Sequence, residues 1–240
     1  MNSLLKIKVK ISFPLGANFY KNLDLYVYKL FLKMIKTLSC MIMNTKCNYC
    51  PLKDNCQYYQ ITGENFQYYP GIFFKVDQFK KNIYQYNEEC EFEILFIGKM
   101  SAYHQYLEIF FKEYLDYQLF SYPFQIKSYR MNELKQEMKY VDVLKVKSVI
   151  EDTNFVCCYN QMVNYYKTNY NCSTPCLKSN VIIDNKRNIK DQMINFSTKK
   201  IYPKGYVYEV KLQQNISCLF FETGIGIFNY IGGGMIENKN

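Results

Sequence analysis

The sequence predicts an α+β fold that consists of two similar units and ends in a glycine-rich stretch. A segment with strand-like alternation, followed by a segment with helical periodicity, occurs near the N-terminus and again from about residue 90. Strand-like segments follow each helix, so the order strand–helix–strand–strand is present twice. This repetition predicts tandem ferredoxin-like (RRM-like) units, which we place at residues 1–86 and 87–240.

The first unit begins with a predicted strand over residues 7–13, where apolar and polar residues alternate. The sequence "PLGAN" interrupts this pattern, and Asn18 is a suitable N-cap for a helix from about Phe19 to Lys36. Its apolar stripes lie on opposite sides and consist of Leu23, Val27, Leu30 and Met34, and of Leu25, Tyr28 and Leu32. We therefore expect this helix to lie between its own sheet and a second covering element. A cysteine-rich insertion and a strand at "PGIFFKV" complete the unit.

The second unit repeats these elements and then adds the glycine-rich loop. Its first half is predicted as a strand at 90–96, an aromatic-rich helix at 101–115, and strands at 123–130 and 141–150. The segment from about Thr153 to Lys200 has little periodicity and is predicted as loops with short strands such as "NVIID". The remaining elements are a strand at 204–212, a short helix at 215–224 and a last strand at 234–238.

The charge balance favours a polyanionic partner. Lysine and arginine number 30 against 21 acidic residues, a net charge of +9, which suits a nucleic acid or an anionic membrane surface. Only Arg130 and Arg187 are arginines, so bidentate phosphate contacts are scarce. Tyrosines interleaved with lysines suit RNA, whose bases stack on aromatic rings. An AT-rich coding sequence would favour the same residue types and is a second explanation of the composition.

Neither a signal peptide nor a membrane span is predicted. The N-terminal sequence "MNSLLKIKVKISF" is interrupted by three lysines, and no run of about 18 apolar residues occurs elsewhere. We therefore expect a cytoplasmic protein with no membrane partner. Its 10 cysteines are then thiols or metal ligands rather than disulfides.

The glycine-rich stretch "GIGIFNYIGGGMI" does not match either common nucleotide-binding loop. A P-loop needs Gly-Lys followed by Ser or Thr, which this stretch lacks. A dinucleotide fingerprint needs a following helix and an acidic residue about 20 positions on, but the sequence ends soon after Gly234. The local alternative is a C-terminal β-turn.

Three stretches together resemble a known family. The first is Gly224-Ile225-Gly226 followed by Gly232-Gly233-Gly234, between a short helix and the last strand. The second is "CNYCP" with "CQY", after the first helix, and the third is "CEFEILFIGKMSAYHQYLEIFFKEYL". In this order they resemble the CRISPR-associated endoribonucleases that cut precursor CRISPR RNA within its repeats, part of the RAMP superfamily. The family has a tandem ferredoxin-like fold, in agreement with the repeat above.

The resemblance implies a metal-independent reaction with no catalytic cofactor. The ribose 2′-OH attacks the adjacent phosphate, leaving a cyclic phosphate and a free 5′-OH, and a general base, a general acid and a cation assist. The implied partners are CRISPR repeat RNA and subunits of a CRISPR effector complex. Because the family's glycine-rich loop lies beside the bound RNA, the expected RNA contacts include Gly224, Gly226, Gly232, Gly233 and Gly234.

Four residues are candidates for this chemistry. The family usually has a catalytic histidine near the first helix, whereas the only histidine here is His104, on the predicted second helix; a half-buried packing histidine is the alternative. The resemblance suggests Tyr28, since members can have an active-site tyrosine on the first helix, with packing between the units as its alternative. Lys36 and Lys46 are candidates for the positive charge.

Further lysines and an arginine are candidate RNA contacts. Lys29 and Lys33 share a helix side with Lys36, although a solvated charged face has the same pattern. Lys127 and Arg130 lie near the end of a predicted strand, where Arg130 could bind RNA or form a surface ion pair.

Four cysteines are candidate ligands for a structural zinc ion. They contain one C-x2-C pair and are Cys40, Cys47, Cys50 and Cys56. An iron–sulfur cluster uses the same ligands, and a set of small buried thiols is the alternative without a metal.

These features lead to three hypotheses. The first is a repeat-specific endoribonuclease of CRISPR immunity. The second is a non-catalytic RNA-binding subunit of a CRISPR effector complex, because the first unit has no histidine. The third is a metal-stapled scaffold protein without a role in RNA binding.

Overall fold

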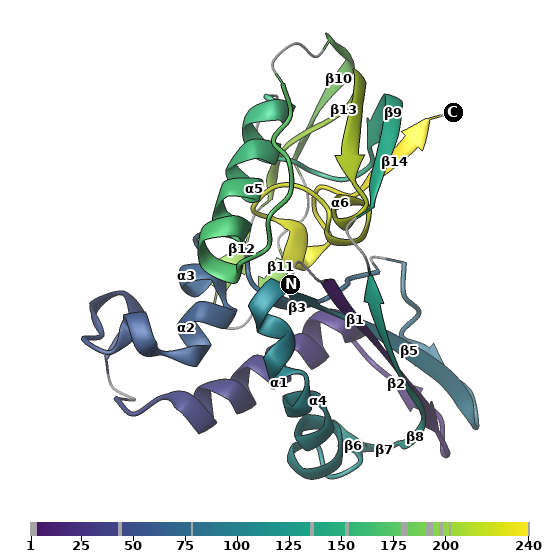
Figure 1. The fold of residues 1–240 in the computed structure, drawn as a ribbon. Helices are drawn as coiled ribbons and strands as arrows, with labels where there is room; N and C mark the ends of the chain where they lie inside the picture. Colours follow the sequence, from purple (N-terminus) through teal and green to yellow (C-terminus); the bar gives the residue numbers. More distant parts are fainter. Residues whose placement is uncertain are drawn as a thin grey trace.

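Two antiparallel four-stranded sheets form the framework of the protein (Figure 1). The computed structural model describes residues 4–42, 45–77, 79–134, 137–151, 154–178, 182–190, 194–196, 199–201 and 203–239. In each sheet the chain runs strand, helix, strand, strand, helix, strand, and the strands lie in the spatial order second, third, first, fourth. The predicted α+β class is confirmed.

The first sheet has the order β3-β5-β1-β8. Its strands are β1 (Leu4–Phe13), β3 (Ile72–Phe74), β5 (Glu88–Ile97) and β8 (Gln125–Leu134). Its helices are α1 (Leu23–Ser39) and α4 (Gln105–Ile109), the latter between a 3₁₀ turn at Gly98–Tyr103 and a π turn at Phe110–Tyr114. Two short ladders pair β2 (Ala17–Asn18) with β4 (Ile83–Tyr84) and β6 (Gln118–Leu119) with β7 (Tyr122–Pro123).

Between α1 and β3 lies the cysteine-rich insertion, which extends from the body of the molecule at the left of Figure 1. It contains 3₁₀ turns at Cys47–Tyr49 and Lys53–Asn55, followed by α2 (Gln57–Ile61) and α3 (Gly63–Phe66). Neither 3₁₀ turn contains a buried residue.

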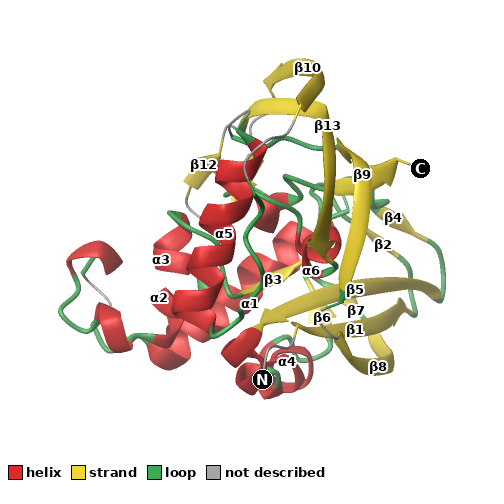
Figure 2. Ribbon diagram, turned by 45° about the horizontal axis from the view of Figure 1, so that its top comes forward, coloured by secondary structure: helices red, strands yellow, loops and turns green. Residues whose placement is uncertain are grey.

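The second sheet has the order β10-β13-β9-β14. Its strands are β9 (Met138–Val146), β10 (Ile182–Lys190), β13 (Lys204–Ser217) and β14 (Ile236–Lys239). Its helices are α5 (Phe155–Tyr170) and α6 (Leu219–Thr223), and a 3₁₀ turn lies at Asn229–Ile231. A small ladder joins β11 (Ile194–Phe196) and β12 (Lys199–Ile201). Figure 2 shows most helices on one side of the molecule and the strands on the other.

The strand pairing divides the chain at a different place from the predicted boundary at residues 86 and 87. Strand β5 pairs with β1 along its full length, and β8 pairs with the other edge of β1. Both strands were assigned to the second unit from the sequence. The change of sheet falls instead between Leu134 and Met138.

Helix α1 begins later than predicted and is covered on both sides, as predicted. Its N-cap is Asn22, whose side chain accepts a hydrogen bond from the backbone N–H of Leu25 at 3.1 Å; Asn18 lies in β2 instead. Val27 and Tyr28 have no exposed surface, although they point in different directions around the helix. The covering elements are α2 of the insertion, whose Tyr58 lies against Lys36, and the second unit, whose Tyr166 and Tyr230 lie near Tyr28.

Helix α5 lies in the segment that was predicted as loops. Its buried residues recur at helical spacing but are mostly tyrosine, cysteine and methionine: Phe155, Cys158, Tyr159, Met162, Val163, Tyr166 and Tyr170. The periodicity was present in the sequence, but aliphatic residues alone do not reveal it. Other parts of the predicted loop segment lie outside the described residues.

Candidate nucleic-acid interface

Helix α1 presents a row of lysines on its outer side. Lys29, Lys33 and Lys36 are exposed, whereas the residues between them, such as Phe31 and Ile35, are buried against the first unit. In the described part of the chain, no carboxylate lies within ion-pair distance of these lysines. Three unpaired cations at successive helical turns form a surface that attracts a polyanion.

Lys36 lies at the junction of three helices. Its Nζ is 5.8 Å from the ring centroid of Tyr58, a cation–π contact with the start of α2. The adjacent Gln57 accepts a hydrogen bond from the Tyr106 hydroxyl at 3.1 Å, which brings α4 to the same helix start. Gln57 and Tyr106 were not among the predicted residues, because only this tertiary contact identifies them.

His104 lies at the start of α4, two residues before Tyr106. Its Nδ1 is 3.0 Å from the carbonyl oxygen of Ser101, and the side chain is half-buried. When Nδ1 carries the proton and donates to this carbonyl, Nε2 is unprotonated, the form that a general base needs. The structure therefore brings the helices of Lys36 and His104 together at the start of α2.

Tyr28 is placed for packing rather than for contact with RNA. It has no exposed surface, and its hydroxyl donates a 2.7 Å hydrogen bond to the carbonyl oxygen of Ile72. Burial raises the pKa of Tyr28 well above its usual value, with smaller contributions from the nearby Tyr230, Tyr58 and Tyr166. A neutral, inaccessible phenol does not serve as a base on a bound RNA, so Tyr28 is not retained in the candidate site.

The Tyr28→Phe variant is expected to lose about 1–2 kcal/mol of unfolding free energy, because the buried carbonyl of Ile72 loses its donor. Urea unfolding followed by tyrosine absorbance measures this change. RNA binding and cleavage, assayed well below the unfolding midpoint, should match those of the unmodified protein. A loss of cleavage without a loss of stability would return Tyr28 to the active site.

The four cysteines of the insertion lie near one another but do not form a metal site in this structure. All four are half-buried free thiols. Burial raises the pKa of Cys47, Lys36 opposes this, and the other three thiols raise it further. Over the residues that the structure describes, no three Cys, His, Asp or Glu side chains are arranged to hold a metal ion. The zinc ion stays a prediction of the spacing alone. Lys46 is exposed beside this cluster.

The glycine-rich loop is buried, and its glycines allow the loop to pack on itself. Gly224, Gly226, Gly232, Gly233 and Gly234 are all buried. A Cβ on Gly234 would lie 1.6 Å from the carbonyl oxygen of Ile225, and one on Gly224 would lie 2.7 Å from that of Gly233. The two halves of the loop therefore approach each other too closely for side chains.

Backbone N–H groups of this loop are used within the protein. Ile225 donates to the carbonyl of Gly234, and Gly234 donates to that of Val149, each at 2.9 Å. The N–H of Ile227 is 3.2 Å from both carboxylate oxygens of Glu151. The glycines permit a buried double turn, and their contact with RNA stays a prediction.

The lysines of β1 do not add to the positive surface, because glutamates of β5 neutralise them. Lys6, Lys8 and Lys10 form ion pairs with Glu93, Glu91 and Glu89, which alternate along the neighbouring strand. On the other edge, Arg130 is in register with Lys8 and is exposed. Lys127 is exposed as well, and its Nζ donates to Gln125. Lys127 and Arg130 thus add exposed positive charge at this edge of the first sheet, apart from the lysines of α1.

The fold is that of Cas6 and RAMP proteins. The solved product complex of a Thermus thermophilus Cas6 protein has 7% identity to this chain, covers 100% of both chains and gives a TM-score of 0.56. A RAMP protein described as binding different RNA substrates has 12% identity to this chain. The match covers 98% of this chain and 100% of that protein, with a TM-score of 0.51. A CRISPR-associated Cas6 protein has 15% identity, and the match covers 99% of this chain and 100% of that protein, with a TM-score of 0.48.

A family model gives a more particular assignment. The model described as "AF_1859_N: N-terminal domain" matches residues 29–153, more than half of the chain. The chain therefore belongs to this family. A search of curated protein sequences finds no match. Within the described residues, no helix is long and apolar enough to cross a membrane.

Proposed function

We propose that this protein binds CRISPR repeat RNA and cleaves precursor CRISPR RNA within the repeats. The observation that supports this proposal most is the fold, shared over the whole chain with a Cas6 protein in its product complex. The order of strands and helices, which is the same in both sheets, supports two ferredoxin-like units in tandem. The unpaired lysines of α1 supply the surface for a polyanion that this function requires.

In the proposed reaction, the 2′-OH of the nucleotide before the scissile bond attacks the phosphate. The bond between phosphorus and the 5′ oxygen breaks, and this oxygen takes a proton from water, giving a cyclic phosphate and a 5′-OH. His104 accepts the 2′-OH proton through Nε2, since Nδ1 faces the Ser101 carbonyl. Lys36 stabilises the charge of the pentavalent phosphate, with Lys46 at the same end of α1 as a second cation. Lys29 and Lys33 hold the RNA along the helix, and Lys127 and Arg130 bind it at the edge of the first sheet.

The alternative function is a non-catalytic RNA-binding subunit of a CRISPR effector complex. The burial of Tyr28 favours it, because this removes one of the two candidates that could exchange a proton with RNA. The two functions require the same RNA surface and differ only in chemistry.

Incubation of the purified protein with repeat RNA of its own genome, in EDTA, tests the reaction. Products with cyclic phosphate and 5′-OH ends, lost in His104→Ala and reduced in Lys36→Ala, are expected for the nuclease. Tight binding without cleavage would support the alternative function. Absence of salt-dependent RNA binding would contradict both functions.

The variant with Lys29→Gln, Lys33→Gln and Lys36→Gln is expected to bind RNA weakly. The loss of three phosphate contacts should reduce the slope of log K against log salt concentration by about 2. It should also reduce the affinity roughly 100-fold at 0.1 M salt. Filter binding over a salt series measures both quantities. The matched control replaces three ion-paired lysines, Lys10, Lys81 and Lys112, with glutamine. Equal losses in the two variants would mean that only net charge matters.

A further inference from the structure

The outer face of the second sheet has more cations than carboxylates. The register places Lys145 opposite both Glu209 and Glu237, so these side chains share one face. The buried Tyr208 and Val210 of β13 point to the other face, toward α5. By the same register, the outer face includes five cations, Lys145, Lys147, Arg187, Lys211 and Lys239, and three acidic positions, Asp184, Glu209 and Glu237.

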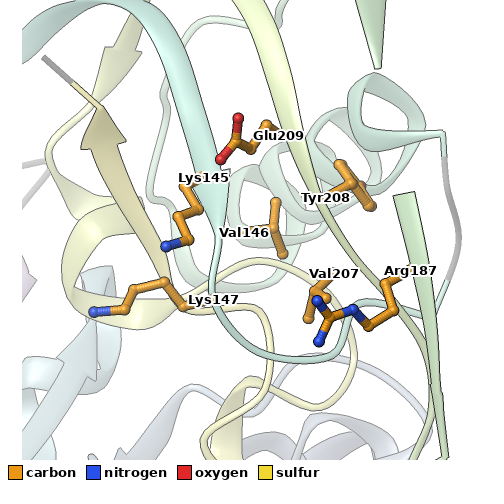
Figure 3. Close-up of a pocket in the computed structure, with 7 residues that line it drawn as sticks. All are labelled: Lys145, Val146, Lys147, Arg187, Val207, Tyr208 and Glu209. Carbon is orange, nitrogen blue, oxygen red and sulfur yellow. The ribbon is translucent and has the colours of Figure 1, made fainter. Parts of the chain in front are cut away.

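Three of these cations line one hollow between β9, β13 and β10 (Figure 3). Its volume is about 390 Å³, and Lys145, Lys147 and Arg187 are joined in its wall by Val207 and Glu209. In Figure 3 the Arg187 side chain runs beside Val207 toward β9. The hollow is therefore a concave site with cations on two sides and an apolar residue between them.

The cations of this hollow are only partly neutralised. Lys147 and Lys145 share a single carboxylate, that of Glu237, at 2.9 Å and 3.6 Å. Glu209 is engaged by Lys239 at 2.9 Å. Arg187 is exposed and has no ion-pair partner among the described residues, and its register partner is the apolar Val207. A guanidinium without a carboxylate is well suited to two oxygens of a phosphate.

We propose that this hollow binds a backbone phosphate of RNA, held by Arg187 and Lys147, at a site separate from the lysines of α1. The inference rests on the proposed function, because it takes RNA as the ligand. Arg187 supplies a two-pronged contact, Lys147 supplies a second charge, and Val207 provides an apolar floor against which a ribose can lie. The site contacts the phosphate and the ribose but not the bases, so it contributes affinity without base specificity.

Binding of a fluorescent single-stranded repeat RNA to the full-length protein, measured over a salt series, tests this site. The Arg187→Ala, Lys147→Ala double variant should lower the salt slope of log K by about 1.4 and the affinity roughly 25-fold at 0.1 M salt. The control variant, Lys81→Ala with Lys112→Ala, removes the same charge from exposed ion pairs elsewhere and should bind as the unmodified protein does. Arg187→Lys keeps the charge and should keep the slope.

Two results of the binding experiment would overturn the proposal. If the double variant and its control bind equally while the unmodified protein binds RNA tightly, the hollow is not a phosphate site and the proposed function stands. If the unmodified protein shows no salt-dependent binding, both fail. A second readout, independent of any variant, is acetylation of lysines with and without RNA. Protection of Lys147 by RNA supports the site, and unchanged acetylation contradicts it.

Discussion

The Gly234→Ala variant is expected to lose about 4 kcal/mol of unfolding free energy, the largest effect of any single substitution considered for this protein. Gly234 has φ of +65°, in the left-handed region that costs other residues about 1–2 kcal/mol. A Cβ there would also lie 1.6 Å from the carbonyl oxygen of Ile225 and 2.7 Å from its nitrogen. Because these are backbone atoms in a buried double turn, no side-chain rotation relieves the overlap.

The comparison for Gly234→Ala is Gly71→Ala, where the neighbours are side chains. A Cβ on Gly71 would meet Met100 Cγ at 2.6 Å and the Tyr170 ring at 2.8 Å, and a methionine side chain can move aside. We expect a loss of about 1–2 kcal/mol there. Chemical denaturation of both variants gives the two values. Similar stabilities for Gly234→Ala and the unmodified protein would mean that the loop is open.

The Glu222→Gln variant is expected to lose about 2 kcal/mol at neutral pH, because it breaks the ionic cluster that joins the two units. Glu222, on α6, lies 2.9 Å from both Lys6 of β1 and Lys75, which follows β3. Glu93 of β5 completes the cluster at 3.1 Å from Lys6. All four side chains are less than a third exposed, so water screens the charges only in part.

The same cluster predicts how stability depends on pH. Burial alone would raise the pKa of Glu222, but hydrogen bonds from Lys6 and Lys75 outweigh it and the net pKa is lowered; Glu93 behaves likewise, with Lys8 and Lys6 as donors. Because the pKa of these glutamates is lower in the folded protein than in the unfolded chain, where it is about 4.3, the cluster stabilises the fold above that pH. This stabilisation is lost as the pH falls through the pKa of the folded protein. Acid should therefore destabilise the unmodified protein more than Glu222→Gln.

Thermal unfolding of both proteins between pH 7 and pH 3 measures this difference. Glu108→Gln is the control, because its partner Lys112 lies one turn away on an exposed helix surface, and little change is expected. Parallel pH curves for Glu222→Gln and the unmodified protein would show that the cluster does not contribute.

The sequence predicted the elements whose periodicity uses aliphatic residues. The alternation in β1 and the double apolar stripe of α1 were both informative, since each reflects a burial pattern that the structure shows. The doubled order of elements also indicated a second sheet. Helix α5 was missed because its core face is built of tyrosine and cysteine, and the start of α1 was misplaced because Asn18 and Asn22 are equally good caps in isolation.

The candidate site was harder to predict from the sequence than the fold, because it depends on which side chains the tertiary structure leaves exposed. Tyr28 and Lys29 are neighbours in sequence, yet one has no exposed surface and the other is exposed. The sequence alone does not distinguish Lys6, Lys8 and Lys10 from the lysines of α1. The difference comes from the pairing of β1 with β5, which places glutamates beside them. The start of α2, where Gln57 contacts Tyr106 across 49 positions of sequence, has no local signal at all.

The separation of charges between β1 and β5 has a consequence for folding in a crowded cell. All three lysines stand on one strand and all three glutamates on its neighbour, so two copies of β1 repel each other, as do two copies of β5. Before the sheet closes, each strand has exposed edges that another chain could extend. Because each strand carries one sign of charge, β1 pairs more favourably with β5 of the same chain than with a second copy of β1. This preference protects the newly made protein from aggregation through its strand edges.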